Sequence, residues 1–140
     1  MPAGYSGTPL AKKLGIKAGQ TVALLGAPEG FDDELEGMPD DVVLRNRATG
    51  TANVIVTFHT WRADLEARTP KLLEVLDADG GLWIAWPKKA SKVPTDITED
   101  TVREVFLPLG LVDNKVCAVN DIWSGLRVVW RVENRPVKRG

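Results

Sequence analysis

The sequence predicts an α/β domain in which helices pack on one mixed sheet, mostly parallel and closing with an antiparallel hairpin. Two runs, 21–25 and 52–58, are apolar on both faces, as in strands that are covered on either side. Later strands alternate with helical segments, and this order favours an α/β layer fold over a barrel or a bundle. The last two apolar runs, 115–119 and 126–131, are joined by a short loop and predict the hairpin.

The first half is expected to hold two short helices and three strands. The pair Thr8-Pro9 suits the start of a helix, and Gly15 suits a left-handed stop. The strands are predicted at 21–25, 41–45 and 52–58, and a brief helix at 31–36. Too few residues separate the second strand from the third for a crossover helix, so one helix of the usual alternation is missing.

A longer helical segment follows the third strand. Thr60 is the expected N-cap, and Pro70 is expected to kink or break the helix, which then restarts through residue 76. The pair Gly80-Gly81 is predicted to close this segment. The run 82–86 is the most hydrophobic of the chain and is expected near the centre of the sheet. Its end is set by Pro87.

The last helix has clear signals at both ends. Thr98 is the expected N-cap, and Glu99 and Asp100 place negative charge at the positive end of the helix dipole. Gly110 follows the last apolar residue and suits the stop. The C-terminal hairpin then completes the sheet.

Composition limits the classes of partner. The 140 residues fit one domain, placed at 1–132, with a polar tail at 133–140 that we expect to be flexible. Because 18 basic and 19 acidic residues give a net charge of -1, no nucleic-acid partner is expected. A signal-peptide stretch and a run of about 20 apolar residues are both lacking, which indicates a cytoplasmic protein without a membrane partner. One cysteine supports neither an internal disulfide nor a Cys-rich zinc site, and no metal is expected.

Two segments carry a resemblance to a known family. The segment 14–26, Leu-Gly-Ile-Lys-Ala-Gly-Gln-Thr-Val-Ala-Leu-Leu-Gly, resembles the entry into the first strand of class I S-adenosylmethionine-dependent methyltransferases. The order of elements from 53 to the final hairpin, including Leu-Asp-Ala-Asp-Gly-Gly-Leu-Trp-Ile-Ala at 76–85, follows the second half of that fold. The resemblance implies a reduced Rossmann-like fold.

A second resemblance covers more of the chain. The segments 4–10, 86–91 and 123–126 are similar to those of an uncharacterised family of short actinobacterial proteins. That family implies no established activity. The resemblance therefore adds nothing about chemistry.

The chain departs from the methyltransferase pattern at the expected cofactor turn. The turn reads Gly26-Ala27-Pro28-Glu29-Gly30, in which Pro28 lacks a backbone donor and Glu29 adds negative charge. At the end of the second strand, Arg45 or Arg47 stands where the family has an acidic ligand for the ribose. These departures weigh against methyl transfer.

Any ligand is expected beyond the carboxyl ends of the parallel strands, where turns and loops meet. The candidate ligand-binding residues there are Gly26, Gly30, His59, Lys88, Lys89, Ser91, Asp121 and Trp123. Lys88 and Lys89 either attract an anion or are solvated loop residues. His59 is either a general base or a strand-end residue bonded to backbone. Trp123 in a hairpin loop either caps a pocket or packs in the core.

The leading interpretation is a non-catalytic or weakly anion-binding cytoplasmic domain, or a protein-interaction module. It has no assigned catalytic residue, and no cofactor is expected. The alternative is an enzyme or sensor that uses S-adenosylmethionine or a nucleotide-like ligand at the carboxyl edge of the sheet. A third interpretation is an oligomer that pairs through the short second strand. The oligomeric state and the direction of that strand stay open at this point.

Overall fold

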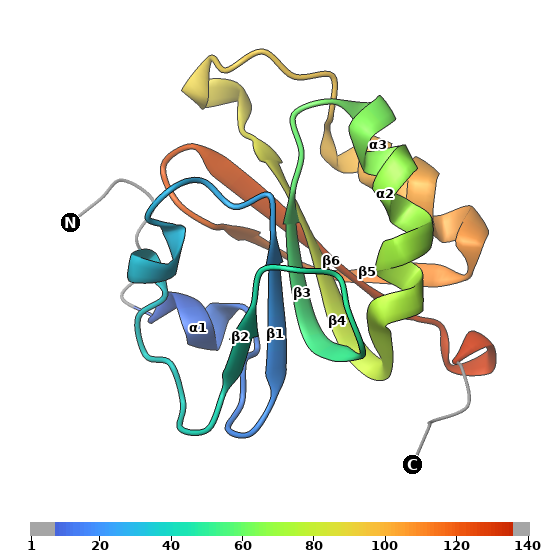
Figure 1. Ribbon diagram of the computed structural model, residues 1–140. Helices are drawn as coiled ribbons and strands as arrows, with labels where there is room; N and C mark the ends of the chain where they lie inside the picture. Colours follow the sequence, from blue (N-terminus) through green and yellow to red (C-terminus); the bar gives the residue numbers. More distant parts are fainter. Residues whose placement is uncertain (1–7, 136–140) are drawn as a thin grey trace.

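A six-stranded sheet forms the centre of the computed structural model, which describes residues 8–135 (Figure 1). The strand order is β2-β1-β3-β4-β6-β5. The strands are β1 (Thr21–Leu25), β2 (Val43–Arg45), β3 (Ala52–Phe58), β4 (Leu76–Pro87), β5 (Leu111–Ala118) and β6 (Trp123–Trp130). Strands β1 to β4 are parallel, and β6 is antiparallel to both β4 and β5. The predicted mixed sheet with a C-terminal antiparallel hairpin is therefore confirmed, and β2 is parallel to its neighbour.

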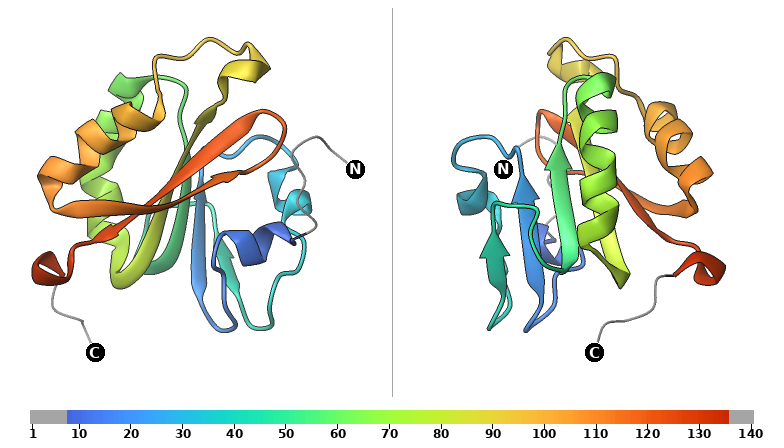
Figure 2. Two further views of the ribbon diagram at one scale, coloured as in Figure 1. Left: turned by 180° about the vertical axis from the view of Figure 1, so that it is seen from behind. Right: turned by 45° about the vertical axis from the view of Figure 1, so that its right-hand side comes forward.

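Helices cover both faces of this sheet (Figure 2). On one face lie α2 (Arg62–Val75) and α3 (Glu99–Phe106), whose apolar residues pack on β3, β4 and β6. On the other face lie α1 (Leu10–Lys13) and the 3-10 helix η1 (Phe31–Glu34). The remaining 3-10 helices are η2 (Lys89–Ser91), η3 (Leu107–Leu109) and η4 (Val132–Asn134).

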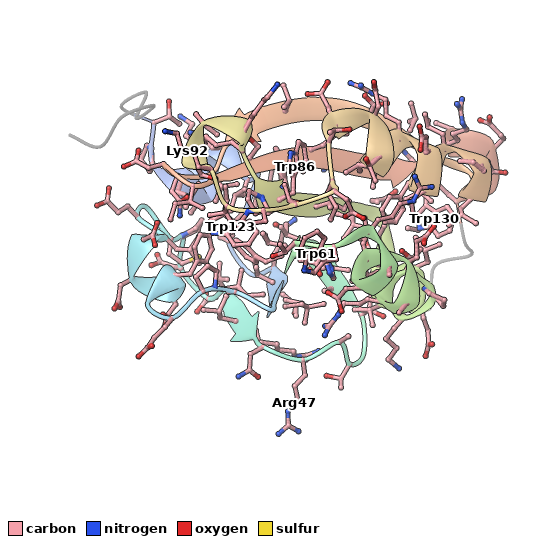
Figure 3. All side chains as sticks on the ribbon, turned by 90° about the horizontal axis from the view of Figure 1, so that it is seen from above. Arg47, Trp61, Trp86, Lys92, Trp123 and Trp130 are labelled. Carbon is pink, nitrogen blue, oxygen red and sulfur yellow. The ribbon has the colours of Figure 1, made fainter. Side chains whose placement is uncertain are left out.

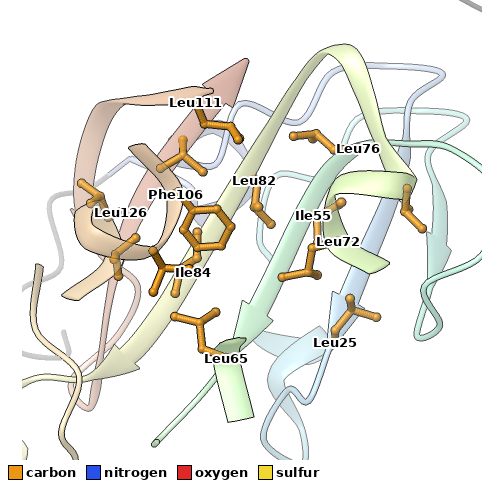
Figure 4. Packing of buried hydrophobic residues seen from close by; sticks show 14 of the residues in the cluster. Leu25, Ile55, Leu65, Leu72, Leu76, Leu82, Ile84, Phe106, Leu111 and Leu126 are labelled. Atoms are coloured by element: carbon orange, nitrogen blue, oxygen red, sulfur yellow. The ribbon is translucent and has the colours of Figure 1, made fainter. Parts of the chain in front are cut away.

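The core consists of two apolar clusters, one on each face. In the first cluster, Leu72 of α2 and Phe106 of α3 are fully buried and pack against strand residues such as Ile84 (Figure 4). In the second cluster, Leu14 at the end of α1 is also fully buried. Burying each such side chain contributes about 1.5–3 kcal/mol. The two clusters hold the sheet between them and set the positions of the strand ends.

The central strand β4 is longer than the sequence predicts. It begins at Leu76 and includes Gly80 and Gly81, which were expected to lie between a helix and a strand. A Cβ at Gly80 would lie 2.7 Å from the carbonyl oxygen of Asn53 on β3. The missing side chain therefore allows the two strands to approach where their register shifts. The predicted central position of the strand is confirmed.

Helix α2 differs from its prediction at both its start and its middle. Its N-cap is Trp61 rather than Thr60, and no side chain caps it. It continues past Pro70, so of the predicted kink or break, the break is wrong. Proline removes one backbone hydrogen bond, whereas the helix keeps its buried contacts through Leu65 and Leu72. Packing on the sheet therefore outweighs the local cost of the proline.

The last helix begins and ends close to the prediction. The Thr98 side chain accepts a hydrogen bond from the backbone of Thr101, and the Thr101 hydroxyl accepts one from the backbone of Thr98. The chain then passes through η3 and turns at Gly110, which has a φ of 97°. The brief helix expected at 31–36 is shorter, since η1 ends at Glu34.

Some sequence predictions fall outside the described residues. These are the part of the actinobacterial resemblance at residues 4–7 and most of the flexible tail, at 136–140. Before that, Asn134 in η4 donates a side-chain hydrogen bond to the Gly110 oxygen at 3.2 Å. Within the described part of the chain, no helix is long and apolar enough to cross a membrane.

Candidate functional site

The main candidate site is a pocket at the carboxyl ends of the neighbouring strands β1 and β2. Its volume is about 730 Å³, within the range of sites that bind small molecules. One wall is the loop that follows β1, and the other is the turn between β2 and β3 (Figure 1). The lining residues are Leu24, Gly26, Ala27, Pro28, Glu29, Gly30, Asp32, Leu44, Arg45, Asn46, Arg47 and Thr49.

The glycines of the first wall shape the loop. Gly26 and Gly30 both have a left-handed backbone, with φ values of 68° and 79°. A Cβ at Gly26 would lie 3.1 Å from the Phe58 oxygen at the end of β3, whereas a Cβ at Gly30 would meet open space. The first glycine therefore allows two strand ends to approach, and the second turns the chain into η1.

Charges of opposite sign line the pocket. Glu29 and Asp32 belong to the loop, and Arg45 and Arg47 belong to β2 and the turn that follows it. All four residues are exposed, so the pocket is open to solvent. Arg45 is fixed by a 3.1 Å hydrogen bond from Nη1 to the Thr49 oxygen. The pocket thus offers acceptors on one wall and donors on the other.

His59 is buried at the end of β3, beside α2, and both ring nitrogens have partners. Nδ1 donates to the Asp64 carboxylate at 2.6 Å, so Nε2 accepts from the Thr57 hydroxyl at 2.7 Å. Only 3% of the residue is exposed. Desolvation by burial lowers the pKa of His59 below 6.5, although the hydrogen bond and charge of Asp64 oppose this. The geometry favours the structural alternative over a general base.

The buried histidine predicts a pH dependence of stability. Its folded pKa lies below 6.5, so the unfolded chain binds the proton more readily and stability falls as pH decreases from about 6.5. Thermal unfolding between pH 7.5 and 5.5 should show a falling midpoint in the wild type and a smaller fall in His59→Asn. Equal falls in the unfolding midpoint for both proteins would contradict the assignment to His59. The nearby charge of Arg68 also lowers the pKa of His59.

The other predicted residues lie at the same edge but do not line the pocket. The Lys88 amide donates to the Ile122 oxygen at 2.7 Å, which joins the end of β4 to the hairpin turn. The Ser91 hydroxyl donates to the Lys88 oxygen at 2.7 Å, and Lys89 and Asp121 are exposed. Seen from above, Lys92 and Arg47 lie on opposite sides of the molecule (Figure 3). Anion binding by the lysine pair stays a prediction.

Trp123 is the first residue of β6, so its predicted place in the hairpin loop is wrong. Its ring meets that of Phe58 edge-on, with centroids 5.1 Å apart, and Phe58 meets Phe31 at 4.9 Å. Such pairs contribute about 0.5–1.5 kcal/mol each beyond their burial. The indole is half-buried in this aromatic group, which supports the core alternative.

Sequence reasoning missed the second wall of the pocket. Arg45 and Arg47 were considered only as poor ribose ligands, and Asn46 and Thr49 were not considered at all. The available signal was the rule that ligands bind beyond the carboxyl ends of parallel strands, which includes this turn once β2 is parallel. Among the described residues, no three side chains cluster to hold a metal ion.

Comparison with known proteins identifies the fold. No family model and no curated protein sequence matches the chain. Solved structures do match. A methyltransferase from Aquifex aeolicus shares 18% identity at a TM-score of 0.57, covering 85% of this chain and 86% of its own. The ribosomal protein L11 methylase of Lactobacillus delbrueckii subsp. bulgaricus shares 14% at 0.54, covering 87% and 75%.

A third match has a bound ligand. The magnesium protoporphyrin IX methyltransferase of Synechocystis PCC 6803, with bound S-adenosylhomocysteine, shares 12% identity at a TM-score of 0.55, covering 86% of this chain and 78% of its own. The fold is that of class I methyltransferases. The predicted Rossmann-like fold is confirmed, and the comparisons bring no support for the actinobacterial family.

Two expectations from the sequence are corrected by these comparisons. The leading interpretation was a non-catalytic domain, and no cofactor was expected. The three matches described above are methyltransferases, and the matches include structures with bound S-adenosylhomocysteine or S-adenosylmethionine. The parallel pairing of β1 and β2 places a pocket beside the glycine loop and Arg45.

Proposed function

We propose that this protein binds S-adenosylmethionine in the pocket between the β1 loop and the β2 turn and acts as a methyltransferase. The observation that carries the proposal is the position of the pocket on this fold. It lies beyond the carboxyl ends of two neighbouring parallel strands, where open α/β sheets bind their ligands. Its volume of about 730 Å³ is sufficient for a nucleoside-sized molecule.

The lining residues fit the chemistry of this cofactor. S-adenosylmethionine carries a sulfonium and an ammonium group, which suit the carboxylates of Glu29 and Asp32. Leu24 and Leu44 offer apolar contact to the adenine, and Arg45 offers donors to the ribose oxygens. When bound, the cofactor supplies an electrophilic methyl group. The net positive charge of the cofactor also explains why an acidic loop is compatible with binding.

Within this proposal, His59 has a positioning role. Its ring joins the end of β3 to the first turn of α2 through Asp64. The loop after β4 is joined to the same turn, because Asp96 accepts a 2.7 Å hydrogen bond from the Arg62 amide. These contacts join the end of β3 and the loop after β4 to the first turn of α2.

Titration calorimetry of the full chain tests the proposal. We expect S-adenosylmethionine and S-adenosylhomocysteine to bind, and Asp32→Asn to weaken S-adenosylmethionine about tenfold by removing a charge next to its cationic groups. The matched control is Asp33→Asn, since Asp33 is the next residue along the chain and does not line the pocket. If neither compound binds at high micromolar concentration, or if the two variants weaken binding equally, the proposal fails.

Family membership, cellular location and partners are also proposed. Membership of the short actinobacterial family rests on the motifs at 4–10, 86–91 and 123–126. A cytoplasmic location rests on the single cysteine. A protein partner, and pairing through β2, also stay predictions.

A further inference from the structure

The end of β2 carries a cation beside the loop that follows β1. Arg45 is the last residue of β2 and pairs with Ala23 of β1, close to the start of the glycine loop. It follows Gly26 by 19 positions. In dinucleotide-binding sheets, a residue about 20 positions after the glycine turn meets the ribose, where a carboxylate accepts from the hydroxyls and an arginine binds a ribose phosphate.

The guanidinium of Arg45 is positioned and available. Its Nη1 donates to the Thr49 oxygen, and a Cβ at Gly50 would lie 3.0 Å from the same nitrogen, so the side chain packs along the turn. Of the five N–H donors of an arginine, one is used in this bond. Within residues 8–135, neither Arg45 nor Arg47 pairs with a carboxylate. Arg47 extends outward from the turn (Figure 3).

The opposite wall is unsuited to a phosphate. Pro28 has no amide hydrogen to donate, and Glu29 and Asp32 repel an anion. The helix that follows, η1, has only four residues and so gives little dipole. An anionic group on a ligand is therefore favoured at the β2 wall and disfavoured at the loop wall.

From this division of charge we infer that the pocket selects an adenosine derivative with a phosphate on its ribose, at the 2′ or 3′ position. The inference rests on the proposed nucleoside pocket, and it names a ligand class other than S-adenosylmethionine, whose ribose carries no phosphate. The ribose phosphate lies against Arg45, and Arg47, whose side chain extends outward from the turn, adds positive charge at longer range. The 5′ substituent lies along the loop, where a neutral or cationic group is favoured.

Calorimetry with matched nucleotides tests this specificity. The probes are adenosine 2′-monophosphate and 3′-monophosphate, compared with adenosine 5′-monophosphate, adenosine and S-adenosylmethionine. We expect at least one of the first two to bind about tenfold more tightly than the 5′ isomer, with an affinity that falls as salt rises. Arg45→Gln should remove the difference, and Arg47→Gln should reduce it. Arg131→Gln is the matched control, because Arg131 is exposed and does not line the pocket.

The outcomes separate this inference from the proposed function. If S-adenosylmethionine binds and the three monophosphates are equal, the inference is overturned and the proposed function stands. If a 2′ or 3′ phosphate is preferred and S-adenosylmethionine does not bind, the inference stands and the methyltransferase proposal fails. If no nucleoside binds, both are overturned. A preference that persists in Arg45→Gln also overturns the inference.

Discussion

Replacing Trp83 with alanine should destabilise the protein by about 3–5 kcal/mol, the usual cost of removing a large aromatic side chain from a core. Trp83 is on the central strand β4 and is 1% exposed. Its Nε1 donates to the Leu14 oxygen at 3.0 Å, which anchors the end of α1 to the sheet. Because small domains are stable by about 5–15 kcal/mol, the variant should lose much of its stability.

Two control variants accompany Trp83→Ala, one for the hydrogen bond and one for the burial of the indole. Trp83→Phe keeps most of the ring but leaves the Leu14 oxygen without its donor, which should cost about 1–3 kcal/mol. Trp61→Ala removes an indole that is 51% exposed and should change stability by at most about 0.5 kcal/mol. Urea unfolding followed by circular dichroism measures all three variants. If Trp61→Ala and Trp83→Ala lost similar amounts of stability, the docking of α1 on the sheet through Trp83 would be contradicted.

Replacing Gly80 with valine should also be strongly destabilising, by about 3 kcal/mol, the upper end for forcing extra atoms into a packed region. Strand propensity alone predicts the opposite sign, because valine is favoured in strands. A Cβ at this position would lie 2.7 Å from the Asn53 oxygen and 3.2 Å from the Asp77 oxygen. These are backbone atoms, which a change of rotamer does not move.

The matched control, Lys115→Val, measures the effect of strand propensity alone. Lys115 is an exposed residue of β5, and Lys115→Val should change stability by at most about 0.5 kcal/mol. Both variants are compared with the wild type by urea unfolding. If Gly80→Val is as stable as the wild type, the close approach of β3 and β4 at this register shift is contradicted.

The same region shows why sequence reasoning placed some elements and misplaced others. Strands β1 and β3 were predicted from runs that are apolar on both faces, and their bounds agree with the structure. The start of β4 contains Asp77, Asp79 and two glycines, which locally favour a turn. Its strand conformation comes from pairing with β3, where Leu76 lies opposite Ala52. Such pairing depends on residues far apart in the chain.

The sequence predicted one wall of the candidate pocket and not the other. Gly26 and Gly30 were expected because they follow a buried strand at the carboxyl edge of the sheet, and both line the pocket. The wall formed by Arg45 and the turn after it was not expected as a site, because the direction of β2 was open. Once β2 is parallel to β1, both strand ends meet at one edge and the two walls face the same space.

By itself, the amino-acid sequence determined the class of fold, the strands buried on both faces, the capped last helix and the edge at which a ligand is expected. These features follow from local patterns, because burial on two faces, helix caps and left-handed glycines each have a short-range signature. Only the tertiary structure decided the direction of β2, the continuity of α2 past Pro70, the full length of β4 and the two-walled pocket. Each of these depends on contacts between distant segments, whose packing energy exceeds the local preferences of the residues involved.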